Sequence, residues 1–205
     1  MNRLVLDGYD RVAPDLFERY DALDTREVNA PIMHLVPSRP SRVLDVGAGT
    51  GRDAAWLAAF GHNVVAVEPT HGLREGGKIR HSQSDIEWLD DRLPELETLA
   101  ARPDVFDFIK LTAVWAHLDP DEQRQSLGAL ANLLAPGGVL AFSIRCGAAP
   151  SDRPVHKVEI GPTIAHARSL GLSLLLDLDA PSVQPANRAL GVTWTWLAFE
   201  ASRAQ

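Results

Sequence analysis

A glycine-rich turn between a short apolar strand and a helix constrains the fold of this chain more than any other feature. The segment 43–46 (VLDV) is apolar apart from Asp45, and Gly47, Gly49 and Gly51 follow it at alternate positions. Glycines permit a tight turn and allow the main chain to approach a flat or charged ligand at the amino terminus of the next helix. The pattern therefore predicts an α/β fold in which this turn contributes to a ligand site.

Short apolar strands alternate with helical patterns along most of the chain. The first five strands are separated by segments of helix length, which is typical of a parallel sheet with helices on both faces. The link 179–191 is rich in Pro, Asn and Ala and favours an antiparallel pair at one edge for the last two strands. The seven predicted strands are 42–46, 63–68, 85–89, 105–111, 138–145, 172–178 and 192–199.

Several helix ends carry recognisable signals. Residues 119–122 (DPDE) are typical of an N-cap, a proline at the first helical position and a capping-box glutamate. Residues 136–138 (PGG) predict the end of that helix and the turn into the fifth strand. Because each glycine costs a helix about 1 kcal/mol relative to alanine, Gly72, Gly76 and Gly77 predict a short or frayed helix after the second strand.

Length and composition exclude several classes of protein. The 205 residues, 45% apolar and 23% charged, suit a single domain over 1–205. A net charge of −7 argues against nucleic acid as a partner. No apolar run is long enough to span a membrane or to form a secretory signal, so we expect a cytoplasmic protein. One cysteine and seven scattered histidines give no metal-binding spacing, and we predict no metal site.

A carboxylate at the end of the second strand points to a nucleoside. Glu68 lies 17 residues beyond Gly51, and an acidic residue there can accept hydrogen bonds from both hydroxyls of a ribose. Residues 49–54 (GTGRDA) also fit a dinucleotide fingerprint, so an NAD(P)-dependent oxidoreductase is one alternative. Against it stand Asp45, where that fingerprint usually has an apolar or small residue, and the lack of a second domain.

Five features follow one another in a characteristic order across residues 40–200. They are the glycine turn, an acidic residue ending the second strand, an acidic pair after the third, a fourth strand leading to a histidine, and a turn before the fifth. In this sequence they are 43–53 (VLDVGAGTGRD), Glu68, Trp88–Asp91 followed by Leu93 and Pro94, Phe106–Ile109 leading to His117, and Pro136–Gly138.

In this order and at about this spacing, the features resemble the class I S-adenosylmethionine-dependent methyltransferases. The resemblance implies a Rossmann-like, doubly wound, seven-stranded sheet that is mostly parallel and has an antiparallel last strand. It also implies a cofactor-binding core over 41–205 and an N-terminal helical lid over 1–40. The cofactor implied is S-adenosylmethionine, and the protein is expected to act as a monomer or a homodimer.

The resemblance assigns roles to individual residues. Asp45 would hold the methionine ammonium, and Glu68 would bind the ribose hydroxyls. Asp90 would accept from the adenine amino group, with Asp91 as the alternative, and Tyr20 would touch the cofactor from the lid. The complete set of implied cofactor-binding residues is Tyr20, Asp45, Gly47, Ala48, Gly49, Gly51, Arg52, Glu68, Pro69, Leu89, Asp90, Leu111 and Thr112.

The activity implied is methyl transfer to an O, N or S nucleophile of a small molecule. Positioning alone can lower such a barrier by roughly 7–11 kcal/mol. His117 is the candidate base for a hydroxyl nucleophile, because a histidine pKa lies near 6.5; a packing role is the alternative. Arg145 could bind an anionic group of the substrate or form a surface salt bridge. A cofactor-binding module without turnover is the non-enzymatic alternative.

Overall fold

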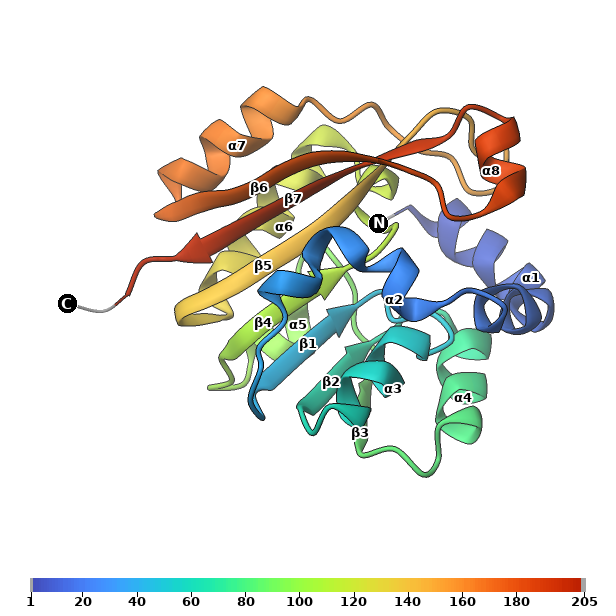
Figure 1. The fold of residues 1–205 in the computed structure, drawn as a ribbon, viewed down its shortest axis with the longest axis horizontal. Helices are drawn as coiled ribbons and strands as arrows, with labels where there is room; N and C mark the ends of the chain where they lie inside the picture. Colours follow the sequence, from blue (N-terminus) through green and yellow to red (C-terminus); the bar gives the residue numbers. More distant parts are fainter. Residues whose placement is uncertain (1, 204–205) are drawn as a thin grey trace.

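The computed structural model describes residues 2–203 and contains one seven-stranded sheet (Figure 1). The strand order is β3-β2-β1-β4-β5-β7-β6. β7 runs antiparallel to both of its neighbours, and every other neighbouring pair is parallel, which confirms the predicted topology. The strands are β1 (Arg42–Val46), β2 (Asn63–Val67), β3 (Ile86–Leu89), β4 (Phe106–Leu111), β5 (Leu134–Cys146), β6 (Leu172–Pro181) and β7 (Thr193–Ala201).

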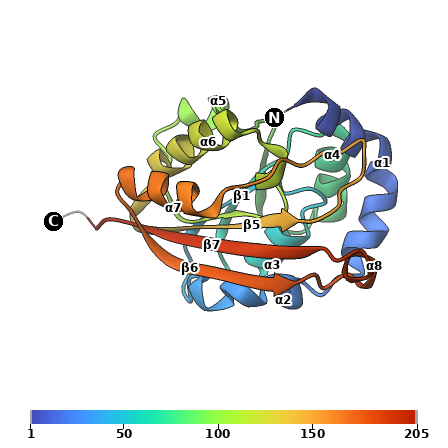
Figure 2. The same ribbon diagram turned by 90° about the horizontal axis from the view of Figure 1, so that it is seen from above.

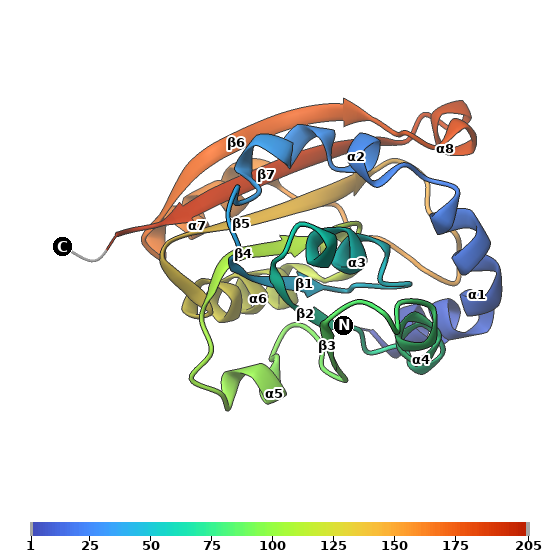
Figure 3. The ribbon, with the colours of Figure 1, turned by 60° about the horizontal axis from the view of Figure 1, so that its bottom comes forward.

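Helices cover both faces of the sheet and one of its ends. Figure 2 shows α2 and α3 on one face and α5, α6 and α7 on the other. α1 and α4 lie together at the end of the sheet (Figure 3). The helices are α1 (Arg3–Asp21), α2 (Thr25–Val28), α3 (Arg52–Ala59), α4 (His71–Arg80), α5 (Glu97–Ala100), α6 (Pro120–Asn132), α7 (Ile160–Ser169) and α8 (Pro185–Ala189), with the 3-10 turns η1 (Ala30–Leu35) and η2 (Trp115–His117).

Each face of the sheet has its own apolar core, because successive side chains of a strand point to opposite faces. On one face Leu44 packs in a cluster with Leu127 and Leu130 of α6. On the other face Val43 and Phe108 pack in a cluster with α3. The central strands are buried on both sides, which explains why their sequences are nearly continuous apolar runs.

The predicted capping box starts α6. The Oδ1 atom of Asp119 accepts from the main-chain nitrogens of Asp121 and Glu122 at 2.9 Å each, and Glu122 Oε2 accepts from Asp119 N at 3.0 Å. The predicted start of the fifth strand at 138 is wrong, because β5 already begins at Leu134. A register shift opposite Phe106 and Phe108 takes up the residues between, among them the predicted turn 136–138.

The prediction of a short or frayed fourth helix is also wrong. α4 runs for ten residues, and its glycines allow close packing. A Cβ atom on Gly76 would lie 2.4 Å from Phe17 Cζ of α1, and one on Gly77 would lie 2.5 Å from Trp88 Cη2 of β3. Contacts that only glycine permits therefore offset its low helix propensity.

The N-terminal segment, expected to be helical, begins with the long helix α1. α1 has nineteen residues and ends at Asp21, so Leu23 lies beyond it. It is joined to α4 by a hydrogen bond of 3.0 Å from Gly72 N to Asp10 Oδ1. Within residues 2–203, no helix has the length and apolar character needed to cross a membrane.

Candidate functional site

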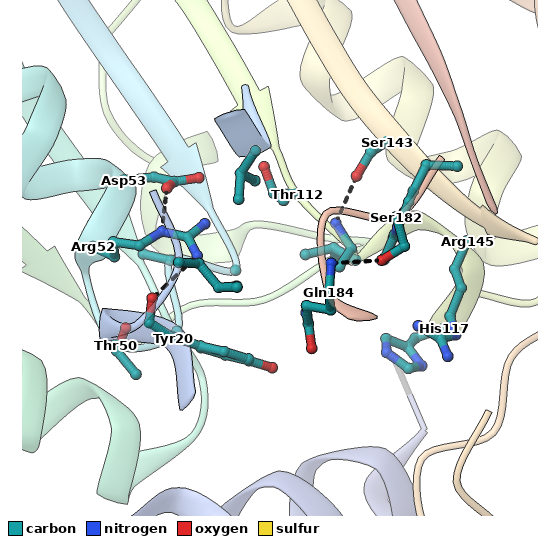
Figure 4. Close-up of a pocket in the computed structure, with 18 of the residues that line it drawn as sticks. Tyr20, Thr50, Arg52, Asp53, Thr112, His117, Ser143, Arg145, Ser182 and Gln184 are labelled. Carbon is teal, nitrogen blue, oxygen red and sulfur yellow. Dashed lines mark hydrogen bonds and ion pairs between the residues drawn. The ribbon is translucent and has the colours of Figure 1, made fainter. Parts of the chain in front are cut away.

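A cavity of about 270 Å³ lies at the carboxyl ends of the central strands. Its wall comes from the turn after β1, the ends of β2, β4 and β5, the helix α1, the loop 147–159 and the segment 180–196 between and within β6 and β7. Figure 4 shows part of this wall, including Ser182 and Gln184 of the last segment. Gly51, Leu89, Asp90 and Leu111 do not line it. Ten of the predicted site residues do: Tyr20, Asp45, Gly47, Ala48, Gly49, Arg52, Glu68, Pro69, Thr112 and His117.

The glycine turn exposes main chain to the cavity. Gly47, Gly49 and Gly51 have φ angles of 72°, 59° and 81°, a left-handed conformation that side chains disfavour. A Cβ atom on Gly47 would lie 2.3 Å from Val114 Cγ2, whereas one on Gly49 would meet nothing within 4 Å. Gly49 is therefore an open cradle in the wall, while Gly51 precedes α3 and packs beneath Trp88.

Glu68 connects this turn to the end of β2. Its side chain is buried, and its two oxygens accept from Gly49 N and Thr70 N at 2.8 Å each. Burial raises the pKa of the carboxyl group, and the hydrogen bonds from Thr70 and Gly49 oppose that rise. A carboxylate offers about four acceptor positions, so Glu68 keeps acceptor capacity toward the cavity.

A buried charge cluster lies beneath the turn. Lys110 of β4 is fully buried, forms an ion pair with Asp53 of α3, and lies 3.8 Å from Asp45 Oδ1. Its Nζ atom also donates to Thr112 Oγ1 at 2.6 Å. Among the described residues, Asp45 Oδ2 has no hydrogen-bond partner. This oxygen is available to a donor that enters the cavity.

The pKa values of the two carboxyl groups in the cluster move in opposite directions. Burial raises the pKa of Asp45 to about 6, against the attraction of Lys110. Burial also acts on Asp53, but the positive charges of Lys110 and Arg52 together hold its pKa below the ordinary value. Asp53 is thus the permanent anion of the cluster, whereas Lys110 only partly offsets the cost of burying a negative charge on Asp45.

Sequence analysis missed Lys110 and Asp53. A signal for Lys110 was present, because Asp45 and Lys110 are each the one charged residue in the buried half of their strands. The parallel register places them side by side. Parallel pairing of the first and fourth strands would have brought the two charges together.

His117 hydrogen-bonds through both ring nitrogens. Nδ1 lies 2.8 Å from the carbonyl oxygen of Pro154, and Nε2 lies 3.0 Å from the hydroxyl of Tyr9. Because a carbonyl only accepts, Nδ1 carries the proton and Nε2 accepts from Tyr9. Burial lowers the pKa of His117, so the ring is neutral at pH 7. Tyr9, which sequence analysis missed, also lines the cavity.

The predicted adenine contact is not part of the cavity wall. Asp90 is 68% exposed and accepts from Arg74 Nη2 at 2.9 Å. Asp91, the alternative, is buried and accepts from the main-chain nitrogens of Arg92 and Leu99. Asp91 therefore has a structural role, and the adenine contact of Asp90 stays a prediction.

The turn after β4 contains a strained residue that the sequence did not reveal. Ala113 has a φ angle of 63°, which is unusual for a residue with a side chain. Its main-chain nitrogen donates to Ser143 Oγ at 2.9 Å, which holds the strained conformation. Both residues line the cavity, and strain of this kind often accompanies functional sites.

In residues 2–203 no three His, Cys, Asp or Glu side chains form a group that could hold a metal ion.

Comparison with known proteins agrees with this architecture. A family model described as a methyltransferase domain matches residues 16–201. The chain belongs to this family. The strand order and the family together define a class I S-adenosylmethionine-dependent methyltransferase domain.

Individual relatives are distant. An uncharacterized methyltransferase of Oceanobacillus iheyensis is 27% identical over 135 residues, which cover 66% of this chain and 57% of the relative. The chain spans between 57% and 59% of the length of three such curated relatives.

Solved structures share the fold. The 1,6-didemethyltoxoflavin-N1-methyltransferase of Burkholderia thailandensis, determined with bound 1,6-didemethyltoxoflavin and S-adenosylhomocysteine, is 18% identical with a TM-score of 0.74. That alignment covers 97% of this chain and 88% of the other. The [4+2]-cyclase SpnF is 14% identical with a TM-score of 0.73, over 98% and 96% of the two chains. Since a protein named for a cyclisation shares the fold, the reaction must be argued from the site.

Proposed function

We propose that this protein transfers the methyl group of S-adenosylmethionine to a nucleophilic atom of a small molecule. One observation carries the proposal. A single cavity combines the open glycine cradle at Gly49, the unpartnered oxygen of Asp45 and the buried carboxylate of Glu68. An amino acid joined to a nucleoside needs these three groups, because it presents an ammonium, a ribose and a surface that main chain can approach.

The residues in the wall fit such a cofactor. Asp45 would accept from the ammonium, and Glu68 would accept from the ribose hydroxyls. Arg52 lines the same end of the cavity and carries the charge to meet the carboxylate of the methionine part. Pro69 and Leu73 offer apolar surface beside Glu68. Bound there, the cofactor supplies a methyl group that is already activated by its sulfonium.

The chain would contribute mainly position and exclusion of water. The N-terminal segment 1–40 acts as a lid in this proposal, since Leu6, Tyr9, Tyr20 and Leu23 all line the cavity. Alignment of an acceptor with the methyl group supplies on the order of 7–11 kcal/mol of barrier reduction. A small cavity closed by a lid favours a small-molecule acceptor over a macromolecule.

Tyr9 and His117 can remove a proton from a hydroxyl acceptor. The acceptor would give its proton to the Tyr9 oxygen while the Tyr9 proton passes to Nε2 of His117 over the existing hydrogen bond. The imidazolium that results keeps its Nδ1 hydrogen bond to Pro154. Because the lowered pKa leaves His117 neutral at pH 7, the ring is ready to accept.

Calorimetric titration with S-adenosylmethionine and S-adenosylhomocysteine tests the proposal. We expect micromolar binding that is lost in Glu68→Ala and kept in Glu95→Ala, because Glu95 is exposed and outside the cavity. Binding of NAD or NADP without S-adenosylhomocysteine would refute the proposal in favour of an oxidoreductase. Tight cofactor binding without methyl transfer to a broad acceptor panel would indicate a binding module.

A further inference from the structure

We propose that the methyl acceptor carries a carboxylate, and that Arg145 and Arg153 bind it. The inference rests on the proposed function and names the substrate class of the same cavity. Both arginines line the cavity. In Figure 4, Arg145 lies beside His117, on the opposite side of the cavity from Arg52 and Asp53.

Arg145 is held in place without an acidic partner. It lies one residue before the end of β5, and its Nε and Nη2 atoms donate to the carbonyl oxygen of Ala148 at 3.0 and 2.7 Å. Nη2 also lies 3.3 Å from Asn187 Oδ1, and the guanidinium lies over the ring of Trp194 at 5.6 Å. Within residues 2–203 it forms no ion pair, and its Nη1 atom has no hydrogen-bond partner. The predicted alternative of a surface salt bridge therefore finds no support.

Arg153 presents a second guanidinium to the same end of the cavity. Its side chain is 14% exposed and lies 5.2 Å from the ring centre of Tyr9. Nε lies 3.4 Å from Asp152, whose carboxylate also lies 3.6 Å from Arg11. In the described part of the chain, both terminal nitrogens of Arg153 lack hydrogen-bond partners. The single carboxylate of Asp152 thus lies near two guanidinium groups, those of Arg153 and Arg11, and Arg145 has no carboxylate partner among the described residues.

The two ends of the cavity differ in charge. At the cofactor end, the carboxylates of Asp45, Asp53 and Glu68 lie close to Lys110 and Arg52, and both of these cations form ion pairs. Arg19 and Glu27 also line the cavity. At the other end, two cations face the cavity nearly uncompensated.

The two positive charges also act on the neighbouring His117. Burial lowers the pKa of His117 most, and the charges of Arg153 and Arg145 lower it further. Half-buried cations without counter-charges are costly, and an anion bound between them would remove that cost. A guanidinium fork matches the geometry of a carboxylate.

Apolar side chains also line this end, beside the polar Ser182, Gln184 and Asn187. Trp194 and Trp196 lie on the same face of β7 and line the cavity together with Val155 of the loop. Aromatic side chains give a large apolar contact surface with defined geometry. The ligand class that matches the site is therefore a carboxylate on an apolar body.

Binding of matched probes to the protein saturated with S-adenosylhomocysteine tests this inference. The probes are benzoate, salicylate, anthranilate and phenylacetate, each compared with its primary amide by calorimetry. We expect at least one carboxylate to bind roughly 10- to 100-fold more tightly than its amide, as charge-assisted hydrogen bonds allow. Arg145→Met and Arg153→Met should each remove this preference. Arg203→Met, an exposed change outside the cavity, should keep it.

Two outcomes would overturn the inference. One is a wild-type protein that prefers no carboxylate of the panel over its amide. The other is a preference that survives in both Arg145→Met and Arg153→Met. Because S-adenosylhomocysteine binding is measured first, its absence refutes the proposed function, whereas its presence without a carboxylate preference refutes this inference alone.

A second measurement does not depend on the probe. Removing a nearby positive charge should raise the pKa of His117, which an NMR titration of the histidine ring protons follows. We expect the pKa of His117 to rise in Arg145→Met and to stay unchanged in Arg145→Lys, because lysine keeps the positive charge. The lysine variant also serves as the comparison if the methionine variant fails to fold. An unchanged His117 pKa in both Arg145→Met and Arg153→Met would contradict the placement of these charges.

Discussion

Replacing Asp45 with asparagine is expected to make the protein more stable at neutral pH while weakening its affinity for S-adenosylmethionine. Asp45 is buried, one of its oxygens has no partner among the described residues, and its nearest cation, Lys110, lies 3.8 Å away. Burial raises its pKa from 3.8 to about 6. The ionised form that the cofactor needs is thus one that the folded protein disfavours.

The size of the effect follows from the pKa. A difference of about 2 between the folded and unfolded values corresponds to about 3 kcal/mol. The unfolded chain releases the Asp45 proton near pH 3.8, whereas the folded protein holds it until about pH 6. The free energy of unfolding therefore falls as the pH rises through this window. Asparagine resembles the neutral form, so Asp45→Asn should match the wild type below the window and exceed it by about 3 kcal/mol above it.

Urea unfolding from about pH 4 to about pH 8 measures this difference. Asp177→Asn is the matched control, because Asp177 is exposed on β6 and lies outside the cavity. The affinity of Asp45→Asn for S-adenosylmethionine, measured by calorimetry at neutral pH, should fall roughly 10- to 100-fold through loss of a charge-assisted hydrogen bond. A variant that is less stable than the wild type at neutral pH would refute the reasoning. So would a gain of equal size at both ends of the pH range.

Two further predictions concern packing and proton transfer. Gly76→Ala should lower the free energy of unfolding by about 1–3 kcal/mol, because its Cβ would lie 2.4 Å from Phe17. Gly128→Ala in α6 should raise the free energy of unfolding by up to about 1 kcal/mol, because a Cβ there meets no atom within 4 Å and alanine favours a helix. Thermal unfolding compares the two, and equal effects would contradict the packing argument. With a hydroxyl acceptor, kcat should be constant near neutral pH and decline only at a pH lower than the ordinary histidine pKa, because burial lowers the pKa at which His117 gains a proton. Tyr9→Phe should lower that kcat by about 10²- to 10⁴-fold, and an unaltered kcat in both Tyr9→Phe and His117→Ala would remove the pair from the mechanism.

The sheet could be predicted because its signals are local. Buried strands with turn residues between them predict a doubly wound sheet, and Gly51 and Asp119 mark the starts of α3 and α6. The glycine turn and Glu68 could be identified for the same reason. Each is fixed by its position at the end of a strand rather than by a distant partner.

The features that the sequence did not predict depend on contacts between distant segments. α4 is a complete helix because Phe17 and Trp88 pack against its glycines, and helix propensity alone does not include that contact. Tyr9 reaches His117 from a helix 108 residues away in sequence. Arg153 lies in an irregular loop with no periodic pattern to predict its direction. These residues belong to the lid and the loop, where acceptor recognition is proposed.

The insertion of β7 between β5 and β6 affects the order in which the protein can be completed during synthesis. One edge of β5 stays unpaired until β7 is made, because β7 is translated after β6 and α8. Until then the emerging chain exposes an unpaired strand edge, which is the kind of surface that promotes aggregation. Since β7 also carries Trp194 and Trp196, the half of the cavity proposed for the cofactor can assemble first. The half proposed to select the acceptor forms only when the sheet closes.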